Sequence, residues 1–101
     1  MLRNDNDILI GDFGMADYWN YNNQYMYNRC GTPGYVAPEI LKDLPYTTNC
    51  DVYSAGIILY YMLTGQEPFK SKDVNKCLAM NMLGRVETKN LGISTSAEDL
   101  L

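Results

Sequence analysis

The chain has 101 residues, of which 47% are hydrophobic and 20% are charged, and its formal net charge is −4. This composition is typical of one small globular domain or of part of a larger one, and it excludes a disordered tail. An acidic chain without a basic patch is a poor partner for nucleic-acid phosphates or for an anionic membrane, so we expect it to bind neither.

The cysteines and the apolar runs narrow the class further. Cys30, Cys50 and Cys77 are widely spaced and the sequence has no histidine, which favours reduced thiols in an intracellular, cytoplasmic protein over a zinc site. The start of the chain has no positive region followed by an apolar run, so it does not predict a secretion signal. The most apolar run, "VYSAGIILYYMLTG", falls short of the ~20 residues that cross a bilayer.

The first predicted elements are short. The apolar residues 8–10, followed by Gly11, predict a short buried strand. Residues 15–29 are rich in Asn and Tyr without a steady period, which predicts a long surface loop. Pro38 is placed where the first turn of a helix tolerates proline, so "APEILKD" predicts one short helix.

A long helix is predicted over roughly residues 49 to 64. Thr48 and Asp51 form a Thr-x-x-Asp capping pattern at its start, and Gly65 ends it. The helix has almost no polar face, so we expect it to be a buried central helix that is packed on all sides.

Two further helices follow. Ser71 is the predicted cap of a helix whose apolar stripe is formed by Val74, Cys77, Leu78 and Met82. Ser94 opens a last helix, with acidic residues in its first turn. The predicted fold class is mainly α with one short β-strand pair at most, in one domain over residues 1–101 and with no second domain. These few elements do not cover an apolar helix on every side, which indicates that the chain is part of a larger fold.

Four motifs in order point to one family. "DFG" at residues 12–14 alone is no more than a β-turn after a strand. It is followed by "GTPGYVAPE", by "DVYSAGIILYYMLTG" and by "EPF". Together these resemble the catalytic domain of eukaryotic serine/threonine protein kinases, where Asp-Phe-Gly and Ala-Pro-Glu bracket the activation segment. The resemblance implies a partial C-terminal lobe of a two-lobed α+β kinase.

The resemblance implies a site for Mg²⁺, ATP and a protein substrate. Asp12 would be a catalytic residue and the metal ligand that holds Mg²⁺ against the ATP phosphates. Phe13 would pack into the core, and Gly14 would let the backbone swing between active and inactive arrangements. The loop of Gly31, Thr32 and Pro33 would receive the peptide, with Thr32 as a catalytic residue typical of enzymes that phosphorylate Ser or Thr.

Other positions would have structural roles in the same family. Asp51 would hydrogen-bond the backbone of the catalytic loop, and Ile58 and Met62 would support the adenine pocket from below. Glu39 would pair with an arginine that this sequence does not contain. The simpler alternatives are that Pro38 and Glu39 only start a helix, that Asp51 only caps one and that Thr32 only supports a turn.

The departures from the family pattern limit what this chain does alone. The glycine-rich loop, the strand lysine, the helix-C glutamate and the His-Arg-Asp catalytic loop that supplies the general base are not in this sequence. We expect the sequence to begin at an internal methionine of a longer kinase, and the 101 residues alone to be inactive and molten or aggregating. Asn28 occupies the position of the usual phosphorylated Thr or Ser.

The wording of the motifs is most like the calcium/calmodulin-dependent kinase group, and calmodulin would bind only through regions outside this chain.

The resemblance leaves two hypotheses open. In the first hypothesis the chain is a portion of an active kinase. In the second it is a non-catalytic remnant or pseudokinase that acts as a protein-interaction module. Retention of Asp12, Phe13, Gly14, Thr32 and Glu39 favours the first.

Overall fold

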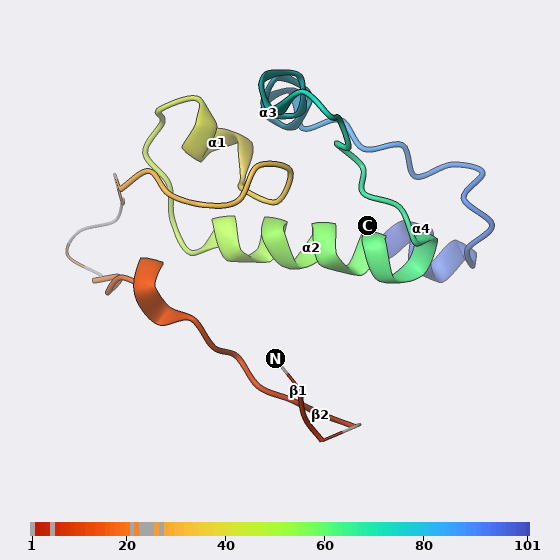
Figure 1. Cartoon of the computed structure of the whole chain (residues 1–101), viewed down its shortest axis with the longest axis horizontal. Helices are drawn as coiled ribbons and strands as arrows, with labels where there is room; N and C mark the ends of the chain where they lie inside the picture. The colour runs from red at the N-terminus through yellow and green to blue at the C-terminus, as the bar shows by residue number, and fades with distance from the viewer. Residues whose placement is uncertain (1, 5, 21, 23–25, 27) are drawn as a thin grey trace.

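The computed structural model describes residues 2–4, 6–20, 22, 26 and 28–101. In chain order its elements are β1 (Leu2–Asn4), β2 (Asp7–Ile8), the 3-10 helix η1 (Phe13–Met15), α1 (Pro38–Leu41), α2 (Asn49–Thr64), α3 (Val74–Leu83) and α4 (Thr95–Leu100). In Figure 1, α2 runs through the middle of the helical part with α1 and α3 above it. The described chain is mainly helical, as the sequence predicts.

The N-terminal strands form an antiparallel pair, with Leu2 opposite Ile8 and Asn4 opposite Asp7. The prediction of a buried strand at residues 8–10 is wrong, because the strand ends at Ile8, and Ile8 and Ile10 are 77% and 84% exposed. A two-stranded ribbon has no second layer of its own to cover its side chains. In Figure 1 the pair lies apart from the helices, at the end of an extended stretch.

The predicted loop at residues 15–29 forms no helix within its described residues after η1. One bridge fixes its later part, since the backbone groups of Met26 and Tyr46 bond to each other at 2.7 and 3.2 Å. Tyr21, Tyr25 and Tyr27 of this loop lie outside the described residues. Tyr18 is almost fully exposed.

The predicted bounds of α2 are confirmed, but its predicted cap is wrong. The helix ends at Gly65, whose φ of 69° is the left-handed conformation that glycine accepts readily. Thr48 makes no side-chain cap bond, because its backbone is already helical at φ −59° and ψ −14°. Instead, the Thr47 hydroxyl accepts a hydrogen bond from the Asn49 N–H at 3.3 Å.

Within this chain α2 is not packed on all sides, as expected from the small number of other elements that the sequence predicts. Ile57 and Tyr60 are its buried side chains, whereas Val52, Ile58 and Met62 are 70%, 50% and 71% exposed. The other described elements are too few to surround a helix of 16 residues. An apolar helix face is therefore left open.

Capping differs between the two later helices. The predicted cap Ser71 is wrong for α3, because the Asp73 carboxylate accepts from the Asn75 N–H at 2.9 Å. Asp73 has the extended backbone that suits an N-cap, while the Ser71 hydroxyl accepts from the Asp73 N–H. The predicted cap Ser94 of α4 is confirmed, since its hydroxyl accepts from the Ala97 N–H at 3.2 Å.

The core lies where α1, α2 and α3 meet the segment that precedes α1. Helices α1 and α3 pack against each other, and α3 ends at Gly84, where an added Cβ would lie 3.0 Å from Pro38 Cγ. The buried apolar side chains of the core are Val36, Ala37, Tyr46, Ile57, Tyr60 and Phe69.

Among the described helices, none has the length and apolar character needed to cross a membrane.

Candidate functional site

The metal end of the predicted site is exposed. Asp12 precedes η1 with φ 61° and ψ 68°, a left-handed conformation that is uncommon for a residue with a side chain. Strained backbone of this kind gathers at functional sites, and it occurs here at the residue predicted to bind metal. Within the described residues, the Asp12 carboxylate makes no hydrogen bond or ion pair, so its oxygens face no protein donor.

The neighbours of Asp12 make few contacts in this chain. Phe13 does not pack into a core within this chain, because its side chain is 69% exposed. Gly14 has no positive φ, and a Cβ on it would meet only Asp12 Oδ1, at 3.6 Å. The conformation of this chain therefore does not itself require glycine at position 14.

The donor set at Asp12 fits one ligand of a magnesium site. Mg²⁺ in phosphate-transfer sites is bound through one or two carboxylates together with waters and substrate phosphates. In the part of the chain that the structure describes, no group of three or more His, Cys, Asp or Glu side chains could hold a metal ion. Asp12 is thus a fitting ligand, but it is not a complete site.

The substrate end of the predicted site is a tight turn at residues 31–36, here called the substrate loop. The Thr32 carbonyl accepts from the N–H groups of Tyr35 and Val36, at 3.0 and 3.2 Å. Gly31 has a φ of 146°, and a Cβ on it would lie only 2.9 Å from two side-chain atoms of Val36. Only glycine therefore fits this close approach.

The exposed side of the substrate loop consists of the three residues predicted to bind the peptide. Gly31, Thr32 and Pro33 are exposed, and the Thr32 hydroxyl makes no bond to the described residues. The Thr32 backbone supports the turn, as the simpler alternative has it, while its side chain stays available. A cavity of about 240 Å³ opens beside Pro33 and is lined in part by Tyr35, Glu67 and Phe69.

The other side of the substrate loop is held by α2. The Ser54 hydroxyl donates to the Tyr35 carbonyl at 2.8 Å. The Tyr35 hydroxyl in turn donates to a Glu67 carboxylate oxygen at 3.1 Å. Burial, followed by the hydrogen bond and charge of Glu67, raises the pKa of the Tyr35 phenol.

Asn81 of α3 also holds this loop, and the sequence analysis missed it. Its side chain is fully buried, and its Oδ1 accepts from the Gly34 N–H at 2.9 Å. Its Nδ2 donates to the Val36 carbonyl, also at 2.9 Å. The available signal was a polar residue three positions after Leu78 and one before Met82, inside the apolar stripe of α3.

Glu39 and Asp51 lie in the first turns of α1 and α2. Glu39 is half-buried, and its carboxylate has no ion-pair partner among the described residues. Burial raises the pKa of the Cys50 thiol, and the negative charges of Asp51 and Glu39 raise it further. Both carboxylates therefore influence the electrostatics of the first turn of α2. Asp51 is exposed and is therefore accessible to a further partner.

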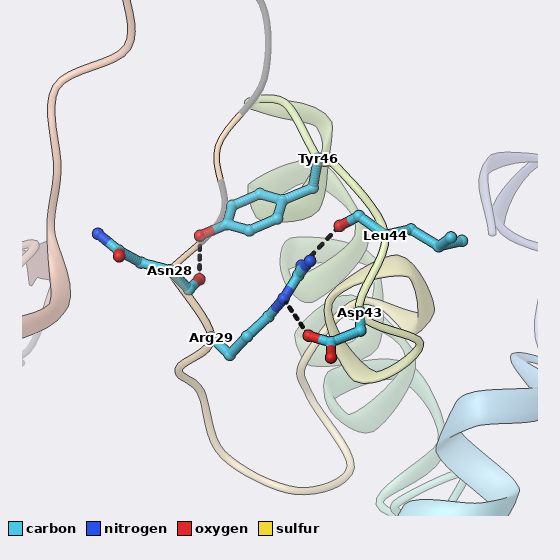
Figure 2. Close-up of polar contacts among 5 residues, drawn as sticks. All are labelled: Asn28, Arg29, Asp43, Leu44 and Tyr46. Atoms are coloured by element: carbon cyan, nitrogen blue, oxygen red, sulfur yellow. Dashed lines mark hydrogen bonds and ion pairs between the residues drawn. The ribbon is translucent and has the colours of Figure 1, made fainter.

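A second cluster that the sequence analysis missed holds the segment just before the substrate loop (Figure 2). Arg29 Nε bonds Asp43 Oδ1 at 2.8 Å, and its Nη1 donates to the Leu44 carbonyl at 2.6 Å. The guanidinium lies over the Tyr46 ring, 5.4 Å from its centroid. The Tyr46 hydroxyl donates to the Asn28 carbonyl. Asn28, predicted to occupy the position of the usual phosphorylated Thr or Ser, is therefore fixed by protein contacts.

Comparison with known proteins identifies the family. A family model described as a protein kinase domain matches residues 1–100. The chain belongs to the protein kinase domain family. In this kinase domain the substrate loop is bonded to α2, and Glu39 and Asp51 lie in the first turns of α1 and α2.

Relatives of this kinase domain have several different names. It is 46% identical over 85 residues to a probable serine/threonine-protein kinase 2 of Plasmodium falciparum (isolate K1 / Thailand), covering 81% of this chain and 16% of that protein. It is 37% identical over 98 residues to a probable myosin light chain kinase of Dictyostelium discoideum, covering 94% and 30%. It is 45% identical over 73 residues to protein kinase C delta type of Homo sapiens, covering 72% and 11%. The chain spans less than a third of each relative, and their names do not single out the calcium/calmodulin-dependent group.

Proposed function

We propose that this chain is the portion of a serine/threonine protein kinase that carries the substrate loop and one Mg²⁺ ligand. The enzyme transfers the γ-phosphate of ATP to a Ser or Thr hydroxyl of a protein. The observation that carries the proposal is the substrate loop itself. Thr32 and Pro33 are exposed on its outer side, and α2 and α3 fix its backbone from behind. A rigid loop of this kind positions a peptide for in-line attack.

The residues of this chain would take separate roles in that reaction. The substrate hydroxyl oxygen attacks the γ-phosphorus, the bond to the β-γ bridging oxygen breaks, and ADP leaves. The hydroxyl proton goes to a general base outside these 101 residues. Gly31, Thr32 and Pro33 would hold the peptide backbone beside that base.

Asp12 would be the chain's metal ligand and its contact with the ATP phosphates. Bound Mg²⁺ supplies neutralisation of the charge on those phosphates. Support comes from the Asp12 carboxylate, which is exposed and bonded to none of the described residues. For the structural positions, we propose that Asp51 bonds the catalytic loop, that Ile58 and Met62 support the nucleotide pocket and that Glu39 meets an arginine.

The test uses the full-length protein that contains this chain. Wild type should transfer labelled phosphate from Mg·ATP to Ser and Thr, but not Tyr, of a peptide library. Asp12→Asn should lower kcat by about 100-fold or more with an unchanged melting temperature, because a charge-stabilising contact is lost. The matched control Asp99→Asn removes an exposed carboxylate of α4 and should keep full activity. Equal kcat for Asp12→Asn and wild type would contradict the metal role.

A non-catalytic interaction module is the second candidate. It is favoured by the contrast between a substrate loop held by α2 and α3 and an Asp12 without partners among the described residues. The coding sequence upstream separates the two. An in-frame His-Arg-Asp-x-x-x-x-Asn and a strand lysine support the kinase, and their absence supports the module.

We further propose membership of the calcium/calmodulin-dependent kinase group and a cytoplasmic location. The wording "GTPGYVAPEIL" supports the first, and the expectation of reduced thiols supports the second. Calmodulin would bind outside this chain, so a calcium-dependent pull-down should succeed with the full-length protein and fail with residues 1–101.

A further inference from the structure

The buried side chain of Asn81 is fully engaged by the substrate loop. Its Oδ1 accepts from Gly34 N–H and its Nδ2 donates to the Val36 carbonyl, both at 2.9 Å. The same Nδ2 donates to the Tyr53 hydroxyl at 3.4 Å. An amide has one acceptor oxygen and two N–H donors, so this one has a partner for each of its groups. A fully buried amide would be costly without them.

The two backbone groups that Asn81 binds determine the shape of the turn. Gly34 has a φ of 91°, and a Cβ on it would lie 3.6 Å from Cys77 Sγ, one helical turn before Asn81. Val36 follows two residues later, and its N–H closes the turn onto the Thr32 carbonyl at 3.2 Å. By holding residues 34 and 36 together, Asn81 fixes the direction in which Thr32 and Pro33 point.

This contact differs in kind from the one that α2 makes. Ser54 binds only the carbonyl of Tyr35 in the loop, whereas Asn81 binds a donor and an acceptor two residues apart, much as a neighbouring strand would. Asn81 lies near the end of α3, and that end is packed close to Pro38 of α1. Loss of Asn81 would therefore leave the loop tethered through α2, but loose at Gly34 and Val36.

We propose that Asn81 is a positioning residue for the peptide substrate, which presents Thr32 and Pro33 by bonding the backbone of Gly34 and Val36. This inference rests on the proposed function of the loop as the peptide-binding surface. In this proposal, the buried side-chain amide of Asn81 in α3 determines the shape of that surface. Asn81 touches neither the peptide nor the nucleotide.

The kinetic test compares two identical substitutions on one helix in the full-length protein. Asn81→Leu removes both loop bonds at similar size, and Asn75→Leu is the matched control at an exposed position of α3. We expect Asn81→Leu to raise the peptide KM by about tenfold, the effect of one or two buried hydrogen bonds, with the KM for ATP unchanged. Asn75→Leu should change neither. A fall in kcat alone, with both KM values unchanged, would show a merely structural role and overturn the proposal.

A second measurement needs no activity, and its first part uses the wild-type protein alone. In the wild-type protein, hydrogen exchange at the Gly34 amide should be strongly slowed, because its acceptor is fully buried. Exchange as fast as at the exposed Gly92 would overturn the proposal. Asn81→Asp keeps an acceptor for that amide and should retain more of the protection than Asn81→Leu.

The two measurements also separate this inference from the proposed function. A wild-type protein that transfers no phosphate and binds no peptide refutes the proposed function, and the substrate role of Asn81 with it. Slow exchange at the Gly34 amide of the wild-type protein, together with a normal peptide KM in an active Asn81→Leu enzyme, refutes only the positioning role of Asn81. Slow wild-type exchange together with the raised peptide KM supports both.

Discussion

The two ends of the segment between Asp12 and Glu39 are built in different ways. At the substrate end, backbone groups of residues 34–36 bond buried or half-buried side chains of α2 and α3. At the metal end, Phe13 and Met15 are 69% and 58% exposed, and Asp12 has no side-chain bond to the described residues. One end is fixed by packing within this chain, and the other is not.

Because of this difference, substitutions at the two ends of the segment should affect different properties of the protein. Substitutions at the substrate end remove buried contacts and should change the free energy of unfolding. Substitutions at the metal end remove little packing, so their effects should appear in catalysis.

The largest effect is expected when residues 1–101 are produced alone. The open face of α2 exposes Val52, Ile58 and Met62, and apolar surface of this kind promotes association. We expect no phosphate transfer from Mg·ATP and no sharp melting transition, measured by a kinase assay and calorimetry. Replacing Ile58 and Met62 with Gln should raise solubility, whereas the same change at the buried Ile57 and Tyr60 should not. A cooperative transition of a monomeric product would contradict this.

The next effect compares one substitution at the two ends in the full-length protein. Gly31→Ala places a Cβ 2.9 Å from Val36 at a φ of 146°, and should destabilise by about 1–3 kcal/mol. Gly14→Ala meets only Asp12 Oδ1 at 3.6 Å and should stay within about 0.5 kcal/mol. Denaturant unfolding measures both. Equal losses at the two glycines would remove the contrast between the ends.

The bounds of α2 and the first residue of α1 were predictable from the sequence because local signals determine them. Gly65 ends α2 in a left-handed conformation, and Pro38 is the first residue of α1. The caps at Thr48 and Ser71 were predicted wrongly, because a cap needs an extended backbone that sequence spacing does not reveal. Thr48 is helical, and Asp73 has the geometry expected of Ser71.

The candidate site was predictable only where its motif is contiguous. The exposed Gly31, Thr32 and Pro33 were found from one stretch of sequence. Asn81 binds backbone groups 47 and 45 residues away, and nothing in its own neighbourhood of the sequence identifies them. The open face of α2 was predictable, because the sequence predicts too few other elements to cover an apolar helix on every side.

A smaller effect is expected at Arg29. Arg29→Lys keeps the charge but loses the planar fork that reaches both Asp43 and the Leu44 carbonyl, and should cost about 0.5–1.5 kcal/mol. The matched control Arg85→Lys lies at an exposed position and should cost almost nothing. Limited proteolysis before Asn28 should be faster in Arg29→Lys alone. Equal cleavage rates in the two variants would show that this cluster does not fix the segment.

The smallest effect is expected in alkaline solution, at the substrate end. Burial and the Glu67 carboxylate raise the pKa of the Tyr35 phenol above the ordinary tyrosine value of about 10, so the folded protein holds this proton more tightly than the unfolded chain. Its contribution to stability is therefore fully present below about pH 10 and is lost as pH rises through the folded pKa. Tyr35→Phe should make the alkaline fall in the free energy of unfolding shallower, by at most about 1.4 kcal/mol per pH unit for one proton. Tyr18→Phe, which changes an almost fully exposed ring at the other side of the segment, should leave the slope as it is. An unchanged slope in Tyr35→Phe would mean that the phenol is as open to solvent as the metal end.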